Sequence, residues 1–418
     1  MIPISKAIKI IRSETQPLSI ESIDLAQAVG RILAEDIIAE TDLPPFDRSQ
    51  MDGFAVIAKD TADVPADLNI AGESAAGKGW HGRLKDGEAI RIMTGAPVPK
   101  GADAIQKVEL TCEMTVPGVH SETVKIIESV KKGQFIVPKG FEVRKGEIVI
   151  MKGEVITPNM IASLAAFSYS KINVSKQPRI TILPTGSEIV GIAETPGTDQ
   201  IRDSNSMMLK ALCEHIGCTV ELLPIADDDL RSLKSAILNS LGKNSSTPKN
   251  KPDNLNTGPE ILIITGGVSV GKYDFTKTAL LELGAEIFFD RVQLKPGKPT
   301  VFAKLGNTLI FGLPGNPVSA AVTFYLFVRT AAMQMQNAAN TLLLKGFAIL
   351  GAAVKAPKER DSYIPAELKT DKEAKLTAKP LKWHGSSDFI GFAKANALIL
   401  APKTRSFDRG DIVEIVYL

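Results

Sequence analysis

The chain has 418 residues, 44% hydrophobic and 23% charged, a composition typical of soluble proteins with two to four domains. Its 49 basic and 47 acidic residues leave a formal net charge of +2, which argues against nucleic acid as the main partner. Three cysteines without a CxxC pair indicate neither a structural zinc site nor a disulfide framework. The start shows no long apolar segment behind its charges, and no run of 18 apolar residues occurs. We therefore expect a cytoplasmic protein that does not span a membrane.

The first part of the chain is predicted to change from helices to strands. Apolar residues recur at helical spacing over residues 4–11 and 20–38, so two helices are expected there. Residues 41–56 contain two prolines and several polar side chains before a glycine turn, which indicates a loop that enters a strand. Short alternating runs between glycine- and proline-rich turns then favour a β-rich domain as far as about residue 141. A short helix over 158–168 leads out of it.

Strands and helices alternate in the following segment. Strands are expected at 179–183, 219–225, 261–265, 286–289 and 308–311, and helices at 206–216, 229–241, 275–283 and from 319 onwards. This alternation predicts a doubly wound, mostly parallel sheet with right-handed crossovers. Residues 242–259, rich in Ser, Asn, Lys and Pro, are interpreted as a solvated insertion without an assigned function. From about residue 332 short strands return and indicate a small β-barrel or sandwich.

The stretch ILIITGGVSVGKYDF, residues 261–275, joins a buried strand to a glycine-rich turn. Gly266 and Gly267 let the backbone leave the strand sharply, and the helical pattern after Asp274 supplies free N–H groups for an anion. We therefore expect a phosphate-like ligand. Tyr273 stands where a P-loop requires Ser or Thr, which disfavours an ordinary P-loop NTPase. A plain surface turn between strand and helix is the alternative interpretation.

Ligands of an open α/β sheet bind outside the carboxyl ends of the strands, so the residues after each strand belong together. These residues are Pro184, Thr185, Gly186, Ser187 and Glu188; Asp227, Asp228 and Asp229; and Ser269 and Asp274. Carboxylates that face a phosphate need a hard cation between them, so Mg²⁺ is expected if the ligand is a phosphate. For the three consecutive aspartates, a helix N-cap is an alternative of equal weight.

Two further stretches add positive charge and rigidity, RVQLKPGKP at 291–299 and FGLPGNPVS at 311–319. Lys295 and Lys298 are fixed by the intervening proline and glycine, which makes a compact cationic turn suited to an oxyanion. The segment from Pro314 to Pro317 forms a rigid loop before an apolar helix. Each stretch alone is equally well explained as a basic hairpin or a helix start, whereas all loops together favour a site.

Six motifs occur in an order that resembles one family: FDRSQMDGFAV, IMTGAPVPKGAD, PTGSEIV, TGGVSVGKYDF, KPGKP and FGLPGNPVSA. The chain resembles the molybdopterin molybdenumtransferases, the MoeA and gephyrin E-domain family, over nearly its whole length. This resemblance implies the last step of molybdenum cofactor synthesis, the Mg²⁺-dependent insertion of molybdate into adenylylated molybdopterin with release of AMP. A catalytically inactive scaffold of the same fold and a P-loop-like nucleotide hydrolase are the alternatives.

The family fold implies an elongated homodimer of multidomain subunits, α/β plus β. Its four parts correspond to residues 1–45 with 142–177 (a helical and linking region whose first helix packs on the α/β domain), 46–141 (the β-rich domain), 178–331 (a MogA-like α/β molybdopterin-binding domain) and 332–418 (a C-terminal β-barrel). The catalytic cleft is expected between the α/β domain of one subunit and the β-rich domain of the other. A molybdopterin adenylyltransferase and apo-molybdoenzymes are expected as protein partners.

The resemblance also implies roles for individual residues. Asp52, Thr94, Glu188, Asp228 and Asp274 are expected to be catalytic, the last three holding Mg²⁺. The expected contacts to the pterin phosphates and molybdate are Thr185, Gly186, Ser187, Gly266, Gly267, Ser269, Lys295, Lys298, Pro314, Gly315, Asn316, Pro317, Ser319, Arg360 and Ser386.

The sequence departs from the family pattern at four positions, one of which, Arg291, keeps the charge of the lysine that the family often has there. Glu142 replaces the usual aspartate of an acidic hairpin, and Val137 lies near the place of an expected arginine. Pro365 replaces the second arginine of a barrel motif that retains Arg360.

Overall fold

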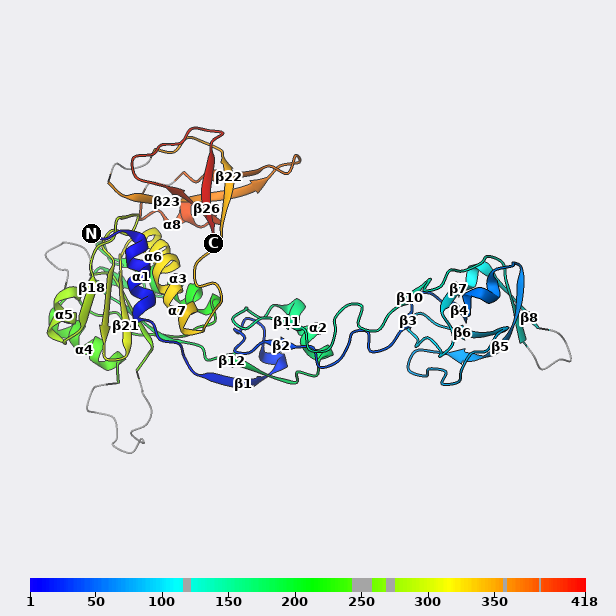
Figure 1. The fold of residues 1–418 in the computed structure, drawn as a ribbon. Helices are drawn as coiled ribbons and strands as arrows, with labels where there is room; N and C mark the ends of the chain where they lie inside the picture. Colours follow the sequence, from blue (N-terminus) through cyan, green and yellow to red (C-terminus); the bar gives the residue numbers. More distant parts are fainter. Residues whose placement is uncertain (116–121, 243–257, 268–274, 356–358, 383–384) are drawn as a thin grey trace, which may run out of the picture. The chain divides into compact units, whose positions relative to one another are not determined.

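The computed structural model describes residues 1–115, 122–242, 258–267, 275–355, 359–382 and 385–418 (Figure 1). Contacts divide the chain into two compact units. The larger unit contains residues 1–35, 152–161 and 170–418, and the smaller unit contains residues 36–151 and 162–169. Each unit has buried hydrophobic clusters of its own. The finer division into four domains stays a prediction.

A six-stranded sheet forms the centre of the larger unit. In spatial order its strands are β16 (Thr219–Leu222), β13 (Arg179–Pro184), β17 (Ile261–Thr265), β21 (Thr308–Leu313), β20 (Val301–Leu305) and β18 (Glu286–Phe289). The first four run parallel, and the remaining neighbours are antiparallel. Every residue of β17 and β21 is buried, as expected for strands covered on both faces. The mostly parallel sheet predicted from the sequence is confirmed.

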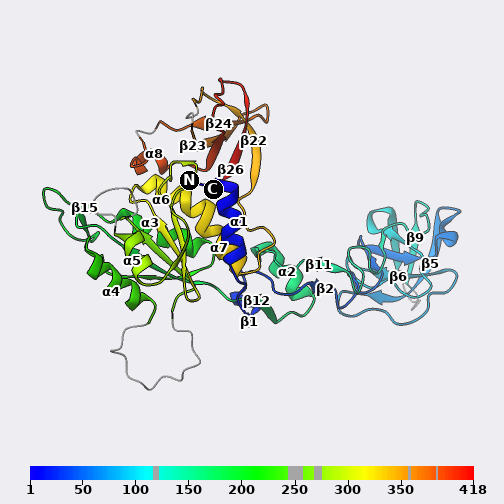
Figure 2. The ribbon, with the colours of Figure 1, turned by 60° about the vertical axis from the view of Figure 1, so that its left-hand side comes forward.

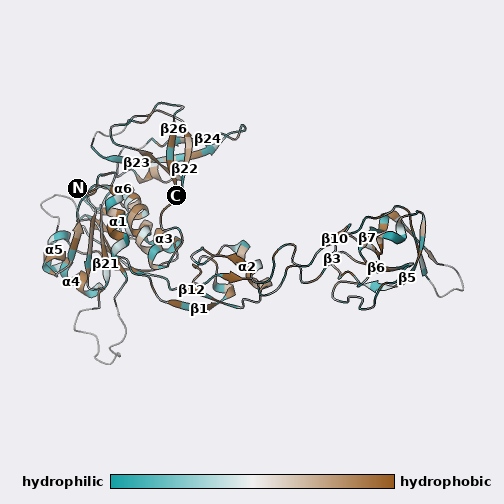
Figure 3. Cartoon of the chain, viewed as in Figure 1, coloured by the Kyte–Doolittle hydropathy of each residue, from teal (hydrophilic) through white to brown (hydrophobic). Residues whose placement is uncertain are grey.

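Helices cover both faces of this sheet, which confirms the doubly wound fold (Figures 1 and 2). One face carries α1 (Ile4–Glu14), α3 (Ser204–His215), α6 (Pro317–Thr323) and α7 (Arg329–Met335), and the other carries α4 (Leu230–Ser240) and α5 (Thr276–Glu282). A π-helical turn, Phe324–Val328, joins α6 to α7, so the two form one long apolar helix. Along β17, Ile261 and Ile263 pack on one face, and Leu262 and Ile264 pack on the other. Figure 3 shows β21, beside β17 in the sheet, in hydrophobic colours.

The start of the chain confirms one expected helix and contradicts the other. Helix α1 forms as expected and packs against α7 (Figure 2). The helix expected over residues 20–38 is wrong, because this segment contains β1 (Ile20–Asp24), a 3₁₀ turn (Leu25–Gln27) and β2 (Ile37–Ile38). Side-chain exposure alternates along β1, which pairs antiparallel with β12 (Lys171–Ser175). Strand pairing therefore overrode an isoleucine spacing that also fits a helix.

The C-terminal part of the larger unit is a closed β-barrel, as predicted. In order around the barrel its strands are β23 (Asp361–Thr370), β24 (Leu376–Pro380), β22 (Lys345–Leu350), β26 (Ile412–Tyr417) and β25 (Ala397–Ala401). Strand β25 pairs back with β23 and closes the barrel. A short strand, β19 (Leu294–Lys295), extends this sheet by pairing parallel with β23. The barrel thereby holds the backbone of Lys295 beside Ser362.

The smaller unit is rich in strands, which confirms the β-rich domain. Its sheet contains, in spatial order, β7 (Ala104–Lys107), β4 (Gly53–Val56), β6 (Glu88–Ile92), β5 (Ala66–Ser74), β9 (Glu122–Ile126) and β8 (Thr111–Thr115). Two buried clusters, one with Phe54 and one with Ala55, occupy its two faces. Shorter elements are β3 (Arg48–Ser49) paired with β10 (Ile136–Val137), β2 paired with β11 (Ile148–Ile150), and 3₁₀ turns at Ala58–Thr61 and Val108–Leu110. Helix α2 (Pro158–Ala166) begins in the larger unit and ends in the smaller one.

The three thiols are free, as the cysteine spacing predicts. Cys213 and Cys218 are buried in the larger unit, whereas Cys112 is exposed in the smaller one. Burial raises the pKa of the Cys218 thiol to about 12, and it also raises the pKa of Cys213 well above its usual value. In the part of the chain that the structure describes, no helix is both long and apolar enough to cross a membrane.

Candidate functional site

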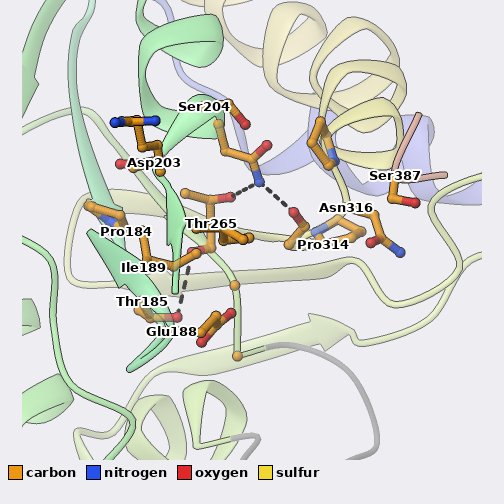
Figure 4. A pocket seen from close by; sticks show the side chains of 18 of the residues that line it. Pro184, Thr185, Glu188, Ile189, Asp203, Ser204, Thr265, Pro314, Asn316 and Ser387 are labelled. Atoms are coloured by element: carbon orange, nitrogen blue, oxygen red, sulfur yellow. Dashed lines mark hydrogen bonds between the residues drawn. The ribbon is translucent and has the colours of Figure 1, made fainter. Parts of the chain in front are cut away.

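Two neighbouring cavities open at the carboxyl ends of the central strands. We call the first the strand-end cavity; it encloses about 1030 Å³. Loops that follow β13, β17 and β21 form its wall, together with the start of α3 and the turn before α8 (Phe389–Phe392) (Figure 4). The predicted site residues that line it are Thr185, Gly186, Glu188, Asp228, Gly266, Gly267, Pro314, Gly315, Asn316 and Pro317. The structure thus brings together predicted residues as far apart in sequence as Thr185 and Pro317.

The second cavity, which we call the cationic cavity, encloses about 580 Å³. Three positively charged side chains line it, Lys295, Lys298 and Arg360. Ser319, at the start of the long apolar helix, and Ser386, from the barrel part, complete the predicted residues in its wall. Pro299, Pro314 and Asn316 line both cavities, so the two share a wall.

The glycine turn after β17 explains how the backbone comes close to the strand-end cavity. Gly266 has φ +102° and Gly267 has φ +58°, a conformation that side chains disfavour. A Cβ at Gly266 would lie 2.3 Å from the carbonyl oxygen of Thr185. The Gly266 N–H donates to the Leu313 carbonyl at 3.1 Å, which ties this turn to the end of β21. Only glycine therefore allows the ends of these strands to meet at this distance.

Two acidic side chains line the same cavity as the glycine turn. Glu188 and Asp228 both line the strand-end cavity. The Asp228 Oδ2 accepts a hydrogen bond from the backbone N–H of Ser187 at 3.1 Å, which holds the two loops together. Asp229 has a different task, because it caps α4 by accepting from the N–H groups of Arg231 and Ser232. Hydrogen bonding to Ser232 lowers the Asp229 pKa. The N-cap interpretation is thus correct for Asp229, while Asp228 belongs to the cavity.

Part of the predicted site lies outside the described residues. This applies to Ser269 and Asp274, and to Tyr273 of the P-loop comparison. Within the described ranges, no three His, Cys, Asp or Glu side chains are grouped closely enough to hold a metal ion. The predicted magnesium trio includes Asp274, so this set stays a prediction. Glu188 and Asp228, the two described members of the trio, both line the strand-end cavity.

The cationic turn is braced on several sides. The Thr300 hydroxyl donates to the Gly297 carbonyl at 2.8 Å, and the Val292 N–H donates to the Lys298 carbonyl at 3.0 Å. Gly297 has φ +114°, and a Cβ there would lie 2.5 Å from the Cγ2 methyl group of Thr323. These contacts fix the backbone between the two lysines, both of which line the cationic cavity.

The barrel part contributes the far wall of the cationic cavity. The Asn316 Nδ2 donates to the Ser386 Oγ at 2.8 Å, and the Val318 N–H donates to the Ser386 carbonyl at 3.0 Å. The half-buried Arg360 donates from Nη1 to the Leu294 carbonyl at 3.4 Å, so part of its guanidinium is already engaged. The cavity depends on these contacts between the α/β sheet and the barrel.

Asp52 and Thr94 meet in the smaller unit. The Asp52 Oδ1 accepts from the Thr94 N–H at 2.7 Å and from the Thr94 hydroxyl at 3.0 Å. An arginine lies close to Val137, the position near which the family pattern has one. Val137 pairs with Arg48 between strands β10 and β3, and the Arg48 Nη2 forms an ion pair with the Glu142 Oε1 at 3.1 Å. An arginine thus accompanies the acidic hairpin from the neighbouring strand.

Sequence reasoning missed several residues of the strand-end cavity, among them two polar residues and one aromatic residue. Asp203 and Asn205 line it at the start of α3, after a two-stranded pair formed by β14 (Ile189–Val190) and β15 (Ile201–Arg202). Phe389, 47% exposed, lines it from the barrel part. Asp203 carries the one readable signal, since Asp before an apolar helix is an N-cap and it accepts from the Ser206 N–H.

Comparisons with known proteins agree with this geometry along the chain. Residues 2–168 match the model of the MoeA N-terminal region (domain I and II), and residues 348–418 match the MoeA C-terminal region (domain IV). Residues 181–334, which contain the glycine turn at Gly266 and Gly267 and the cationic turn, match the model of a probable molybdopterin binding domain. Fold and cavities therefore define a protein of the class with a molybdopterin-binding α/β domain.

Relatives of known name narrow this class. The chain is 32% identical to a molybdopterin molybdenumtransferase of Staphylococcus aureus (strain COL), over 99% of this chain and 95% of the relative. It is also 32% identical to the enzyme of the same name from Bacillus subtilis (strain 168), over 100% and 94%. A solved moeA protein from Pyrococcus horikoshii OT3 superposes with a TM-score of 0.80 at 28% identity, and all of both chains is covered. The chain belongs to the MoeA family of molybdopterin molybdenumtransferases, which are enzymes.

Proposed function

We propose that the chain inserts molybdate into adenylylated molybdopterin and releases AMP in a Mg²⁺-dependent reaction. One observation carries the proposal: a cavity with glycine turns and carboxylates shares a wall with a cavity lined by three cations. A pterin phosphoanhydride fits the first and a small oxyanion fits the second. The shared wall allows both ligands to bind close to each other.

The strand-end cavity would hold the adenylylated pterin. The turn at Gly266 and Gly267 exposes backbone to the phosphates, and Thr185 offers a hydroxyl group from the cavity wall. Ser187 follows in the same loop and would add a second hydroxyl group. Glu188 and Asp228 would hold Mg²⁺ together with Asp274. When bound, this ion neutralises negative charge on the phosphate oxygens during cleavage of the phosphoanhydride. The proposed reaction requires no side-chain nucleophile, so the residues bind, orient and compensate charge.

The cationic cavity would hold the molybdate substrate. Molybdate is a dianion, and Lys295, Lys298 and Arg360 supply three positive charges around one space. Ser319 and Ser386 add hydroxyl donors. Each charge-assisted contact contributes on the order of 1.5–3 kcal/mol. The cations thus bind the oxyanion next to the pterin, where its metal can be transferred to the dithiolene sulfurs.

We further propose a homodimer in which Asp52 and Thr94 of one protomer complete the site of the other. The mutual hydrogen bonds of these two residues support this, because they fix a carboxylate on an exposed loop of the smaller unit. A cytoplasmic location, a molybdopterin adenylyltransferase that delivers the substrate and apo-molybdoenzymes that receive the product remain predictions.

The test combines purified protein with adenylylated molybdopterin, molybdate and Mg²⁺. AMP release and reconstitution of an apo-molybdoenzyme are measured together, with molybdate or Mg²⁺ omitted as controls. We expect both products only in the complete mixture. Pterin binding without AMP release would indicate a scaffold, and ATP turnover without pterin would indicate a nucleotide hydrolase.

A further inference from the structure

A single amide side chain connects the two loops that form the shared wall and the glycine turn. Asn205 lies in the first turn of α3 and is 8% exposed. Its Nδ2 donates to the Thr265 Oγ1 at 3.2 Å and to the Gly315 carbonyl at 2.7 Å (dashed lines in Figure 4). Thr265 ends β17, and Gly315 belongs to the loop after β21. Both amide hydrogens are therefore used to join the ends of neighbouring strands.

The orientation of this amide is chemically determined. The carbonyl of Gly315 can only accept a hydrogen bond, so the nitrogen of Asn205 must face it. The Oδ1 is buried and has no hydrogen-bond partner among the described residues. An unpaired buried oxygen is unfavourable, and it is retained here because the nitrogen makes both contacts. The role of the Asn205 side chain is thus to connect Thr265 with Gly315.

The connection continues into the cationic cavity. Asn316 follows Gly315 directly, lines both cavities and donates from Nδ2 to the Ser386 Oγ at 2.8 Å. Hydrogen bonds therefore link Thr265, Asn205, the 315–316 backbone and Ser386 in series. This series runs from the glycine turn, through the shared wall, to the barrel part.

We propose that Asn205 is a positioning residue that fixes the separation between the pterin and the oxyanion. This inference rests on the proposed function. Asn205 acts through the backbone of Gly315 and Asn316, which belongs to the wall between the two cavities. The groups proposed to bind each ligand are other residues, so Asn205 affects where the ligands lie relative to each other. Losing the amide would let the wall shift relative to the glycine turn. A misplacement of about 1 Å between reacting groups reduces rates by roughly a hundredfold.

The expected signature is a loss of rate with little loss of binding. In Asn205→Asp, which keeps the volume and removes both donors, we expect the rate of AMP release to fall about tenfold to a hundredfold. The affinity for adenylylated molybdopterin alone, and the molybdate concentration for half-maximal rate, should change by less than about threefold. Asn205→Ala is measured alongside because it introduces no buried charge.

Gln336 is a matched control. It is 0% exposed in the same unit, and its Nε2 donates to two carbonyls, those of Ile216 and Ala332, at 3.2 and 3.3 Å. Its Oε1 also has no partner among the described residues, and it lines neither cavity. Gln336→Leu should lower the melting temperature about as much as Asn205→Ala, without changing the kinetics of the folded protein.

The measurements are single-turnover AMP release, equilibrium binding of the pterin nucleotide, and melting temperature, all on the full chain. Selective loss of rate in both Asn205 variants supports the inference. Three results overturn it: parental rates in both variants, rates reduced only in proportion to the unfolded fraction, as in Gln336→Leu, or weakened binding of one ligand alone. If the parent protein itself releases no AMP, the proposed function fails first, and the two failures are distinguishable.

Discussion

The strand-end cavity and the cationic cavity share a wall but are built differently. The first is formed mainly by loops that directly follow the parallel strands β13, β17 and β21, so sheet topology brings most of its residues together, and Ser387 and Phe389 are added from the barrel part. The second takes Lys295 and Lys298 from a braced turn, Ser319 from a helix start, and Arg360 and Ser386 from the barrel part. The strand-end cavity thus follows mainly from the α/β fold, whereas the cationic cavity takes two of its polar side chains from the barrel part and requires the barrel to pack against the sheet. Substitutions should therefore separate pterin chemistry from oxyanion binding.

The largest effect is expected for the acidic side of the strand-end cavity. Glu188→Gln removes a charge and keeps the shape, so AMP release should fall on the order of a hundredfold while pterin binding changes little. Single-turnover AMP release at several Mg²⁺ concentrations measures this, and chelation of Mg²⁺ should abolish release in the parent. Glu194→Gln, on a nearby exposed loop outside the cavity wall, is the control. A parental rate in Glu188→Gln at saturating Mg²⁺ would contradict the role of Glu188.

The next largest effect concerns the two lysines of the cationic cavity. Lys295→Ala or Lys298→Ala should raise the molybdate concentration for half-maximal rate roughly tenfold to a hundredfold, because one charge-assisted contact is lost. Affinity for the pterin nucleotide should stay close to that of the parent. Lys234→Ala, which removes a surface ion pair with Glu282, serves as the control. If both alanine variants keep the parental molybdate dependence, the oxyanion binds elsewhere.

Two glycines should affect the cavities separately. Gly266→Ala places a Cβ against the Thr185 carbonyl, so pterin affinity should fall about tenfold, while Gly297→Ala should instead raise the molybdate requirement by a similar factor. Gly351→Ala, in the barrel part and outside both cavity walls, is the control, because its Cβ would first meet the Thr377 Cγ2 methyl group, at 3.2 Å. Binding and molybdate titrations of the three variants provide the comparison. Equal damage to both ligands by either Gly266→Ala or Gly297→Ala would show that the cavities are not separable.

The smallest effect is expected for Arg360. Its guanidinium already donates to the Leu294 carbonyl, and the second arginine of the barrel motif is replaced by Pro365, so its contribution to the oxyanion is reduced. Arg360→Ala should raise the molybdate requirement only about threefold, which corresponds to roughly 0.6 kcal/mol. An increase in the molybdate requirement as large as that of the lysine variants would contradict this and show that Arg360 contributes to anion binding as much as each lysine.

The sequence predicted the strand-end cavity better than the cationic one, for physical reasons. The apolar run that ends at Gly266 identifies a buried strand and its turn through local composition alone. Lys295 and Lys298 were recognisable because proline and glycine fix the segment between them. Asn205 gave no such signal, since its partners Thr265 and Gly315 lie 60 and 110 residues away and only the folded sheet brings them close.

Contacts between residues that lie far apart in sequence also explain the wrong helix prediction and the residues that were assigned only from the family resemblance. The isoleucines of residues 20–38 fit a helix and also fit strands, and the decision came from β12, almost 150 residues further along the chain. Arg360 and Ser386 were assigned from motifs and not from periodicity. Local patterns specify strands and turns, whereas long-range pairing decides between alternatives that are locally equivalent.

The two buried thiols have a consequence for metal selectivity. The substrate's dithiolene offers sulfur ligands to molybdenum, and cysteine binds metals as the thiolate. Cys213 and Cys218 are kept protonated by burial, and no cysteine lines either cavity among the described residues. Among the described residues, neither cavity therefore presents a thiolate that would compete for a metal transferred there as proposed. The protein's own contacts to molybdate would be oxygen and nitrogen donors that bind the oxyanion by charge and release the metal to the pterin.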